Sequence, residues 1–174
     1  MALRKILTEP NEFLRKKSLP VEKVDDELRK IMDDMLETMY AAPGIGLAAI
    51  QIGVQKRIIV IDLAKQGEPK NPMFFINPEI IKTSITNSTY EEGCLSVPGQ
   101  FAEISRPDKC YIKYLDYYGQ KKEIKAEGMI ATCIQHEMDH LEGILFIDYL
   151  SKLKKSMIIK KLSKQKKAIE RIIV

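Results

Sequence analysis

The feature that most constrains this chain is the stretch QHEMDHLEG at residues 135–143, which contains the only two histidines in the sequence. His136 and His140 are four residues apart, and Glu137 directly follows the first. Residues at this spacing lie on one face of an α-helix, so both imidazoles can reach one metal ion. Glu137, about 100° around the helix, can lie beside a water molecule on that ion. The pattern therefore predicts a metal-binding helix that needs a third ligand.

The third ligand must be a carboxylate or a cysteine, because no histidine remains. Cys133 shares the helix face, but the metal should lie about 7.5 Å further along the axis, which is too far for a short thiol. Cys110 lies in a strand-like alternation and is more simply a small buried hydrophobe. Cys94 remains, in EEGCLSVPG, where glycine and proline should break regular structure around the thiol. We predict Cys94 as the ligand; the alternative is an inert buried thiol.

A second distinctive stretch is GIGLAAIQIG at residues 44–53. Its small residues, Gly44 and Gly46 among them, allow a backbone to pass close to a ligand, and Gln51 offers both an amide donor and an acceptor. Taken alone, the stretch is equally typical of a tight connection between a helix and a strand, because it lacks the spacing of a dinucleotide fingerprint.

The remaining patterns predict an α+β domain. Residues 25–40 place their methionine, leucine and isoleucine residues on one helical stripe behind an acidic first turn. Residues 57–63 and 74–82 are short β-branched or aromatic runs typical of strands, and residues 110–128 predict a hairpin that turns at Gly119. We expect mixed or antiparallel strands packed around a central metal-binding helix, with an N-terminal helix and a C-terminal basic helix.

Composition favours one globular domain, since 45% of the 174 residues are hydrophobic and 30% are charged. We assign residues 1–150 to a catalytic region and residues 151–174 to a basic helix of the same domain. Three cysteines without paired spacing do not make a disulfide framework, and the first residues lack the apolar run of a secretory signal. We expect a cytoplasmic protein that does not bind to or span a membrane.

The C-terminal segment, residues 151–174, carries nine Lys or Arg and one Glu, a net charge of +8 that leaves −4 for the rest of the chain. Its apolar residues recur at helical spacing, which predicts an amphipathic helix beginning at Ser151. Two interpretations stay open: a docked helix with a solvated lysine face, or a basic arm that meets a polyanion such as ribosomal RNA.

Taken together, the stretches GIGLAAIQ, EGCLS and HEMDH resemble the three motifs of the peptide deformylases, in the order that this family has them. The resemblance extends over nearly the whole chain, and one departure is Ile50, where many members carry proline. It implies hydrolysis of the formyl group from the N-terminal formylmethionine of newly synthesised polypeptides. It also implies that the C-terminal helix is of the bacterial kind, which docks on the ribosome.

The resemblance further assigns roles at the site. Cys94, His136 and His140 would hold one divalent metal, Fe²⁺ by preference, with Zn²⁺, Ni²⁺ or Co²⁺ as substitutes. Glu137 would act as general base toward a water that the metal activates. Glu92 and Asp139 are candidates to orient ligands, although an ordinary surface charge explains Asp139 equally well.

By the same resemblance, the amide of Gln51 and the backbone N–H of Leu95 would stabilise the negative charge that develops on the formyl oxygen. The predicted substrate-binding residues are Gly44, Ile45, Gly46 and Cys133. Two alternatives stay open: a zinc endopeptidase of the His-Glu-x-x-His type, and a non-enzymatic RNA-binding module with a structural metal.

Overall fold

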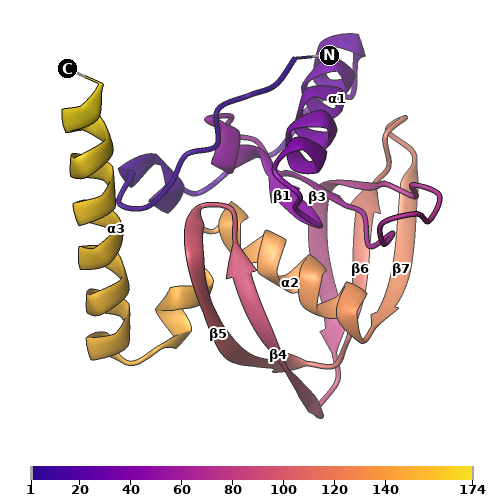
Figure 1. The fold of residues 1–174 in the computed structure, drawn as a ribbon. Helices are drawn as coiled ribbons and strands as arrows, with labels where there is room; N and C mark the ends of the chain where they lie inside the picture. Colours follow the sequence, from indigo (N-terminus) through magenta and orange to yellow (C-terminus); the bar gives the residue numbers. More distant parts are fainter. Residues whose placement is uncertain (1, 174) are drawn as a thin grey trace.

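The computed structural model describes residues 2–173, whose helices and strands are shown in Figure 1. The α-helices are α1 (Asp26–Ala41), α2 (Met129–Leu141) and α3 (Lys152–Ile172), and the 3₁₀ helices are η1 (Glu12–Arg15), η2 (Ala49–Ile52) and η3 (Phe146–Tyr149). The strands are β1 (Gly46–Ala48), β2 (Ile58–Ile61), β3 (Met73–Thr83), β4 (Asn87–Cys94), β5 (Val97–Pro107), β6 (Lys109–Leu115) and β7 (Lys121–Glu127). The predicted α+β class is confirmed.

Five of the strands form one antiparallel sheet in the order β1-β2-β3-β6-β7, and β4 pairs only with β5 in a separate hairpin. Helix α2 lies between the sheet and this hairpin, as Figure 1 shows, and contacts β1, β2 and β7 on one side and β5 on the other. The helix that carries both histidines is therefore central, as the sequence predicted.

The side chains of β2 explain why helices cover both faces of the sheet. All four of its residues are buried, and successive side chains of a strand point to opposite faces. Ile58 and Val60 pack with the methionines of α1, which are the predicted helical stripe. Ile59 and Ile61 pack with residues of α2 in a second cluster. The sheet thus has one helix on each face, and α2 is held against it by apolar contacts.

The hairpin around Cys94 corrects one expectation from the sequence. Gly93, Pro98 and Gly99 were expected to break regular structure, but Gly93 belongs to β4, and Pro98 and Gly99 belong to β5. A two-stranded sheet leaves one side of each strand unpaired, where proline needs no hydrogen-bonding partner for its nitrogen. Gly99 is accommodated because it takes a φ of +72°, which glycine adopts without strain. A register shift between Gly93 and Cys94 remains as the local irregularity.

Helix α3 begins after Ser151, whose side chain accepts a hydrogen bond from the Lys154 N–H, as the sequence predicted. Its apolar side is only partly covered. Leu162 is buried against the hairpin and η3, with Ile158 beside it, whereas Leu153 and Ile172 are 72% and 83% exposed. The helix therefore touches the body of the protein through its middle. Within residues 2–173, no helix is long and apolar enough to cross a membrane.

The end of α2 leads to a first prediction. Gly143 follows the helix with a φ of +74°, and a Cβ there would overlap the backbone carbonyl of Arg15. Gly53 has a similar φ of +80°, but a Cβ there would meet nothing within 4 Å. Gly53→Ala should cost about 1–2 kcal/mol of unfolding free energy from the left-handed conformation alone. Gly143→Ala should cost about 1–3 kcal/mol more, because backbone must shift.

Urea unfolding of both variants beside the unsubstituted protein measures this difference. Equal losses in the two variants would show that the close approach of Arg15 to the end of α2 does not constrain the fold.

Candidate metal centre and active site

Three side chains from two distant segments meet at one point. His136 and His140 project from the same face of α2, and Cys94 projects from the end of β4. One ligand atom from each lies within 4.8 Å of the other two, and the Cys94 Sγ lies 3.3 Å from the His140 Nε2. In tetrahedral coordination, sulfur and nitrogen ligands of one ion lie about 3.5 Å apart. The donor set and its spacing therefore fit one divalent metal ion.

The Cys94 thiol is surrounded by polar hydrogens. The Ser96 backbone N–H lies 3.4 Å from the Cys94 Sγ, and the Gln51 Nε2 lies 3.5 Å from it. The Gln51 Oε1 accepts a hydrogen bond of 2.8 Å from the Ala48 N–H, and the Gln51 Nε2 donates one of 3.0 Å to the Ser96 Oγ. These bonds fix the Gln51 amide beside the thiol, with its donor turned toward the ligand group.

The His136 ring is held in place by a contact at its Nδ1 nitrogen. Its Nδ1 lies 2.7 Å from the Glu92 Oε1, which leaves Nε2 directed toward the ligand group. Glu92 in turn accepts two hydrogen bonds from the Arg106 guanidinium, of 2.8 and 3.1 Å. Burial raises the pKa of Glu92, but the bonds to His136 and Arg106 outweigh burial and hold that pKa below its ordinary value. Glu92 is therefore an anion that orients His136.

Glu137 and His140 are buried beside this arrangement. Burial raises the pKa of Glu137 to about 7, although the nearby His136 opposes the shift. The Glu137 Oε2 is buried and forms no hydrogen bond within residues 2–173. Burial is the main cause that lowers the pKa of His140 well below its ordinary value, and the positive charge of His136 lowers that pKa further. A neutral imidazole is the form that binds a metal.

A pocket of about 450 Å³ opens onto these groups. Its lining includes all four of the predicted substrate-binding residues, Gly44, Ile45, Gly46 and Cys133. Cys133 is buried in the wall, and burial raises the pKa of its thiol to about 12. Cys110 lies in the apolar core instead. Neither cysteine belongs to the ligand group found among the described residues, and the sequence had predicted that neither would be a ligand.

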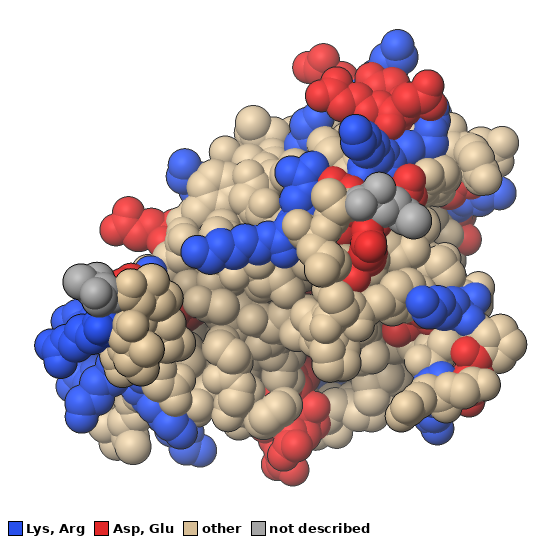
Figure 2. All heavy atoms as spheres, turned by 45° about the horizontal axis from the view of Figure 1, so that its top comes forward, with Lys and Arg blue, Asp and Glu red and all other residues tan. Residues whose placement is uncertain are grey.

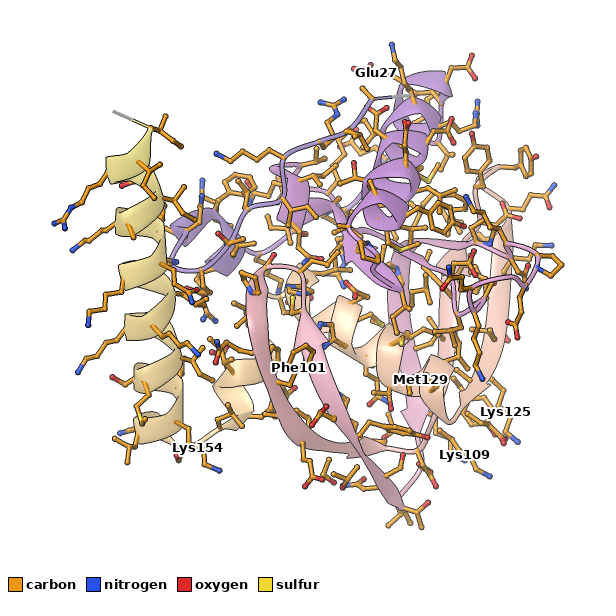
Figure 3. The ribbon with its side chains drawn as sticks, viewed as in Figure 1. Glu27, Phe101, Lys109, Lys125, Met129 and Lys154 are labelled. Atoms are coloured by element: carbon orange, nitrogen blue, oxygen red, sulfur yellow. The ribbon has the colours of Figure 1, made fainter. Side chains whose placement is uncertain are left out.

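Several residues of the site were not anticipated from the sequence. Phe101 on β5 and Met129 at the start of α2 line the pocket, and both are labelled in Figure 3. Ser96 holds Gln51, and Arg106 holds Glu92. Ser96 stands two residues after Cys94 and could have been found from that position, whereas Arg106 carries no local signal.

Known proteins resemble this chain over nearly its whole length. A family model described as Polypeptide deformylase matches residues 3–156. The chain belongs to the polypeptide deformylase family. It is 67% identical over 174 residues to the peptide deformylase of Pelagibacter ubique, covering 100% of both chains, and 62% identical over 168 residues to that of Phenylobacterium zucineum, covering 97% and 99%.

Solved structures of deformylases have the same fold. A crystal structure of the peptide deformylase from Ehrlichia chaffeensis in complex with actinonin superposes with a TM-score of 0.91 at 46% identity, covering 95% of this chain and 98% of that one. A deformylase from Legionella pneumophila gives a TM-score of 0.90 at 47% identity, covering 98% and 99%. The chain is thus a hydrolase that removes formyl groups from peptides, and the zinc endopeptidase alternative finds no support.

The close approach of β1 to Glu137 leads to a second prediction. A Cβ at Gly46 would overlap the Glu137 carboxylate. Gly46→Ala should therefore displace this group and lower the rate of deformylation about 100-fold, because small misplacements of a reacting group are costly. Metal content should not change, since no ligand moves. Steady-state formate release and metal analysis of the purified variant measure the two quantities.

The control is the same substitution in a Glu137→Gln background. If displacement of Glu137 is the cause, Gly46→Ala should have little further effect there. Additive losses would mean that Gly46 acts through the pocket wall and not through Glu137.

Proposed function

We propose that this chain removes the formyl group from the N-terminal formylmethionine of newly synthesised polypeptides, with Glu137 as general base beside a divalent metal on Cys94, His136 and His140. The observation that carries the proposal is the position of Glu137, a buried carboxylate with a raised pKa that lies beside the three ligands and faces the pocket. Because nascent chains are made in the cytoplasm, we place the reaction there.

The ligand set supports the metal part of the proposal. One thiolate and two imidazoles suit several divalent ions, and we propose Fe²⁺ as the working metal, with Zn²⁺, Ni²⁺ or Co²⁺ as substitutes. The bound ion supplies Lewis-acid chemistry, which lowers the pKa of water and polarises a carbonyl oxygen. Cys94, which is partly exposed, and the buried His136 and His140 supply three ligands, so a position stays available to the reaction.

Glu137 moves the proton in this proposal. It accepts a proton as water adds to the formyl carbon, and it returns this proton to the amine nitrogen as the C–N bond breaks. The products are formate and a peptide with a free N-terminus. A carboxylate with a pKa of about 7 suits both halves of this cycle, because it can hold or release a proton near neutral pH.

Gln51 and Leu95 stabilise the negative charge that builds on the formyl oxygen. The Gln51 Nε2 is a fixed donor beside Cys94, and Leu95 is the residue that follows Cys94 and lines the pocket. Donors that are already oriented need no rearrangement during the reaction. The methionine side chain would occupy the apolar part of the pocket, whose walls include Ile45 and Cys133, with Gly44 and Gly46 giving close access.

The decisive experiment compares Glu137→Gln with the unsubstituted enzyme, both prepared anaerobically with Fe²⁺. Formate release from a formyl-methionyl peptide should fall at least about 100-fold in the variant, because the proton acceptor is lost while the ligands remain. Glu142→Gln is the matched control, since Glu142 lies at the end of the same helix but is exposed and paired with Arg57 and Lys17.

Formate release that persists in Glu137→Gln would refute the role of Glu137. A metal-loaded, unsubstituted protein that releases no formate would refute the reaction itself.

We further propose that α3 brings the enzyme to the ribosome. Figure 2 shows Lys and Arg side chains gathered over the outer side of this helix. Lys160, Lys164 and Lys167 are exposed and stand at positions that share one helical face. Clustered positive charge on one face is the electrostatic pattern expected for contact with the phosphates of RNA.

A triple substitution of Lys160, Lys164 and Lys167 to glutamine should weaken co-sedimentation with ribosomes at least about 10-fold at low salt, and binding of the unsubstituted protein should fall steeply as salt rises. Glutamine at Lys121, Lys122 and Lys125 of β7 removes the same charge elsewhere and should have little effect. Equal losses in both variants would argue for non-specific attraction.

A further inference from the structure

The short helix η3 contacts the metal centre from outside the ligand set. It lies between α2, which carries both histidines, and α3. Its first residue, Phe146, is 1% exposed, and its ring is stacked on that of His136 with 6.2 Å between ring centroids and 25° between ring planes. This contact limits rotation of the His136 ring from the side opposite the sheet.

The last residue of η3, Tyr149, is connected to His136 indirectly, through a series of hydrogen bonds. Its hydroxyl donates a hydrogen bond of 2.7 Å to the Asp139 Oδ2. This aspartate oxygen also accepts a hydrogen bond of 2.8 Å from the Arg106 Nη1. The Tyr149 ring also covers the Arg106 guanidinium, with 4.9 Å between the guanidinium carbon and the ring centroid. Tyr149 therefore fixes Arg106 both directly and through Asp139.

Arg106 completes the connection to the ligand. Its Nε and Nη2 donate to the two oxygens of Glu92, and the Glu92 Oε1 faces the His136 Nδ1 at 2.7 Å. The Arg106 and Glu92 side chains are each only 5% exposed. Water cannot easily replace a lost partner of Arg106 or Glu92 at this depth, so a displacement of Arg106 is carried to Glu92 and from there to His136.

The position of η3 is itself fixed on two sides. Asp148, within η3, lies 2.6 Å from the Arg15 Nη1 of the N-terminal segment and 2.6 Å from the Lys155 Nζ of α3. It also accepts a hydrogen bond from the Leu145 N–H at the start of the helix. A 3₁₀ helix of four residues has little stability of its own, so these bonds are what make it a rigid support.

We propose that Tyr149 and Asp139 are positioning residues of the metal centre, which hold His136 in its metal-binding orientation through Arg106 and Glu92. The proposal rests on the metal site described under Proposed function. Its consequence is that η3, although it supplies no ligand, sets the affinity of the site for its metal. Asp139, for which a surface charge was an equal explanation from the sequence, then has a defined role.

The experiment uses Co²⁺ as the probe and the whole 174-residue chain. The dissociation constant of Co²⁺ is measured by competition with a chelator, and the visible absorption bands of the bound ion report the geometry of its ligands. Tyr149→Phe and Asp139→Asn should each raise the dissociation constant about 10-fold, because outer-shell partners of a metal ligand usually contribute 10- to 100-fold. The absorption bands should shift in both variants.

Tyr117→Phe is the matched control. Its hydroxyl also bonds a carboxylate, Asp33, at 3.0 Å, but it packs with α1 in the cluster on the opposite face of the sheet. This variant should bind Co²⁺ as the unsubstituted protein does. Thermal unfolding of the metal-free proteins separates positioning from general damage: Tyr149→Phe should unfold within a few degrees of Tyr117→Phe.

Dissociation constants and spectra of Tyr149→Phe and Asp139→Asn that match those of the unsubstituted protein would overturn the proposal while leaving the metal site intact. Failure of the unsubstituted protein to bind one Co²⁺ per chain would overturn the metal site and this proposal together.

Discussion

The ion pairs of Arg106 join the two parts of the molecule that must meet for a metal centre to exist. Glu92 and Arg106 belong to the hairpin of β4 and β5, whereas His136 and Asp139 belong to α2. The guanidinium binds a carboxylate from each part, and the hairpin carboxylate faces His136. Because Cys94 stands two residues after Glu92 on the same strand, the bonds that fix Glu92 against α2 also bring the thiol to the histidines.

Burying these charged side chains costs folding free energy unless every partner is present. A buried charge that loses its partner destabilises a protein by about 3–5 kcal/mol, whereas an intact buried pair gains little over apolar packing. Arg106 and Glu92 therefore contribute less to net stability than to a unique docking of the hairpin on α2. The apolar contacts of Ile59 and Ile61 hold α2 on the sheet independently of these charges. The fold and the orientation of the site thus rest on different interactions.

The parts that the sequence predicted are those whose signal is local. The helical stripe of α1, the strand of Ile58–Ile61 and the hairpin at Gly119 each follow from periodicity and turn residues, and all are present. The meeting of Cys94 with the histidines was predicted by eliminating the other two cysteines, which are a pocket wall and a core residue. Arg106 could not be predicted, because its function depends on partners 14 and 33 positions away in the chain. The strand pairing around Cys94 was missed because Gly93 and Pro98 suggest a break, whereas Gly93 pairs with Phe101 and Pro98 lies in the register shift between the two strands.

The origin of the third ligand decides which reaction a His-Glu-x-x-His helix supports. A downstream carboxylate of the same region would complete a peptidase-like site, but Glu142 points away from the ligand group toward Arg57 and Lys17 at the surface. The thiol of Cys94 comes instead from the hairpin, and the Gln51 amide of η2 is held beside it by Ser96. Gln51, Cys94 and His136 line the same pocket. In the proposed reaction, α2 supplies the base and two ligands, and the hairpin supplies the third ligand.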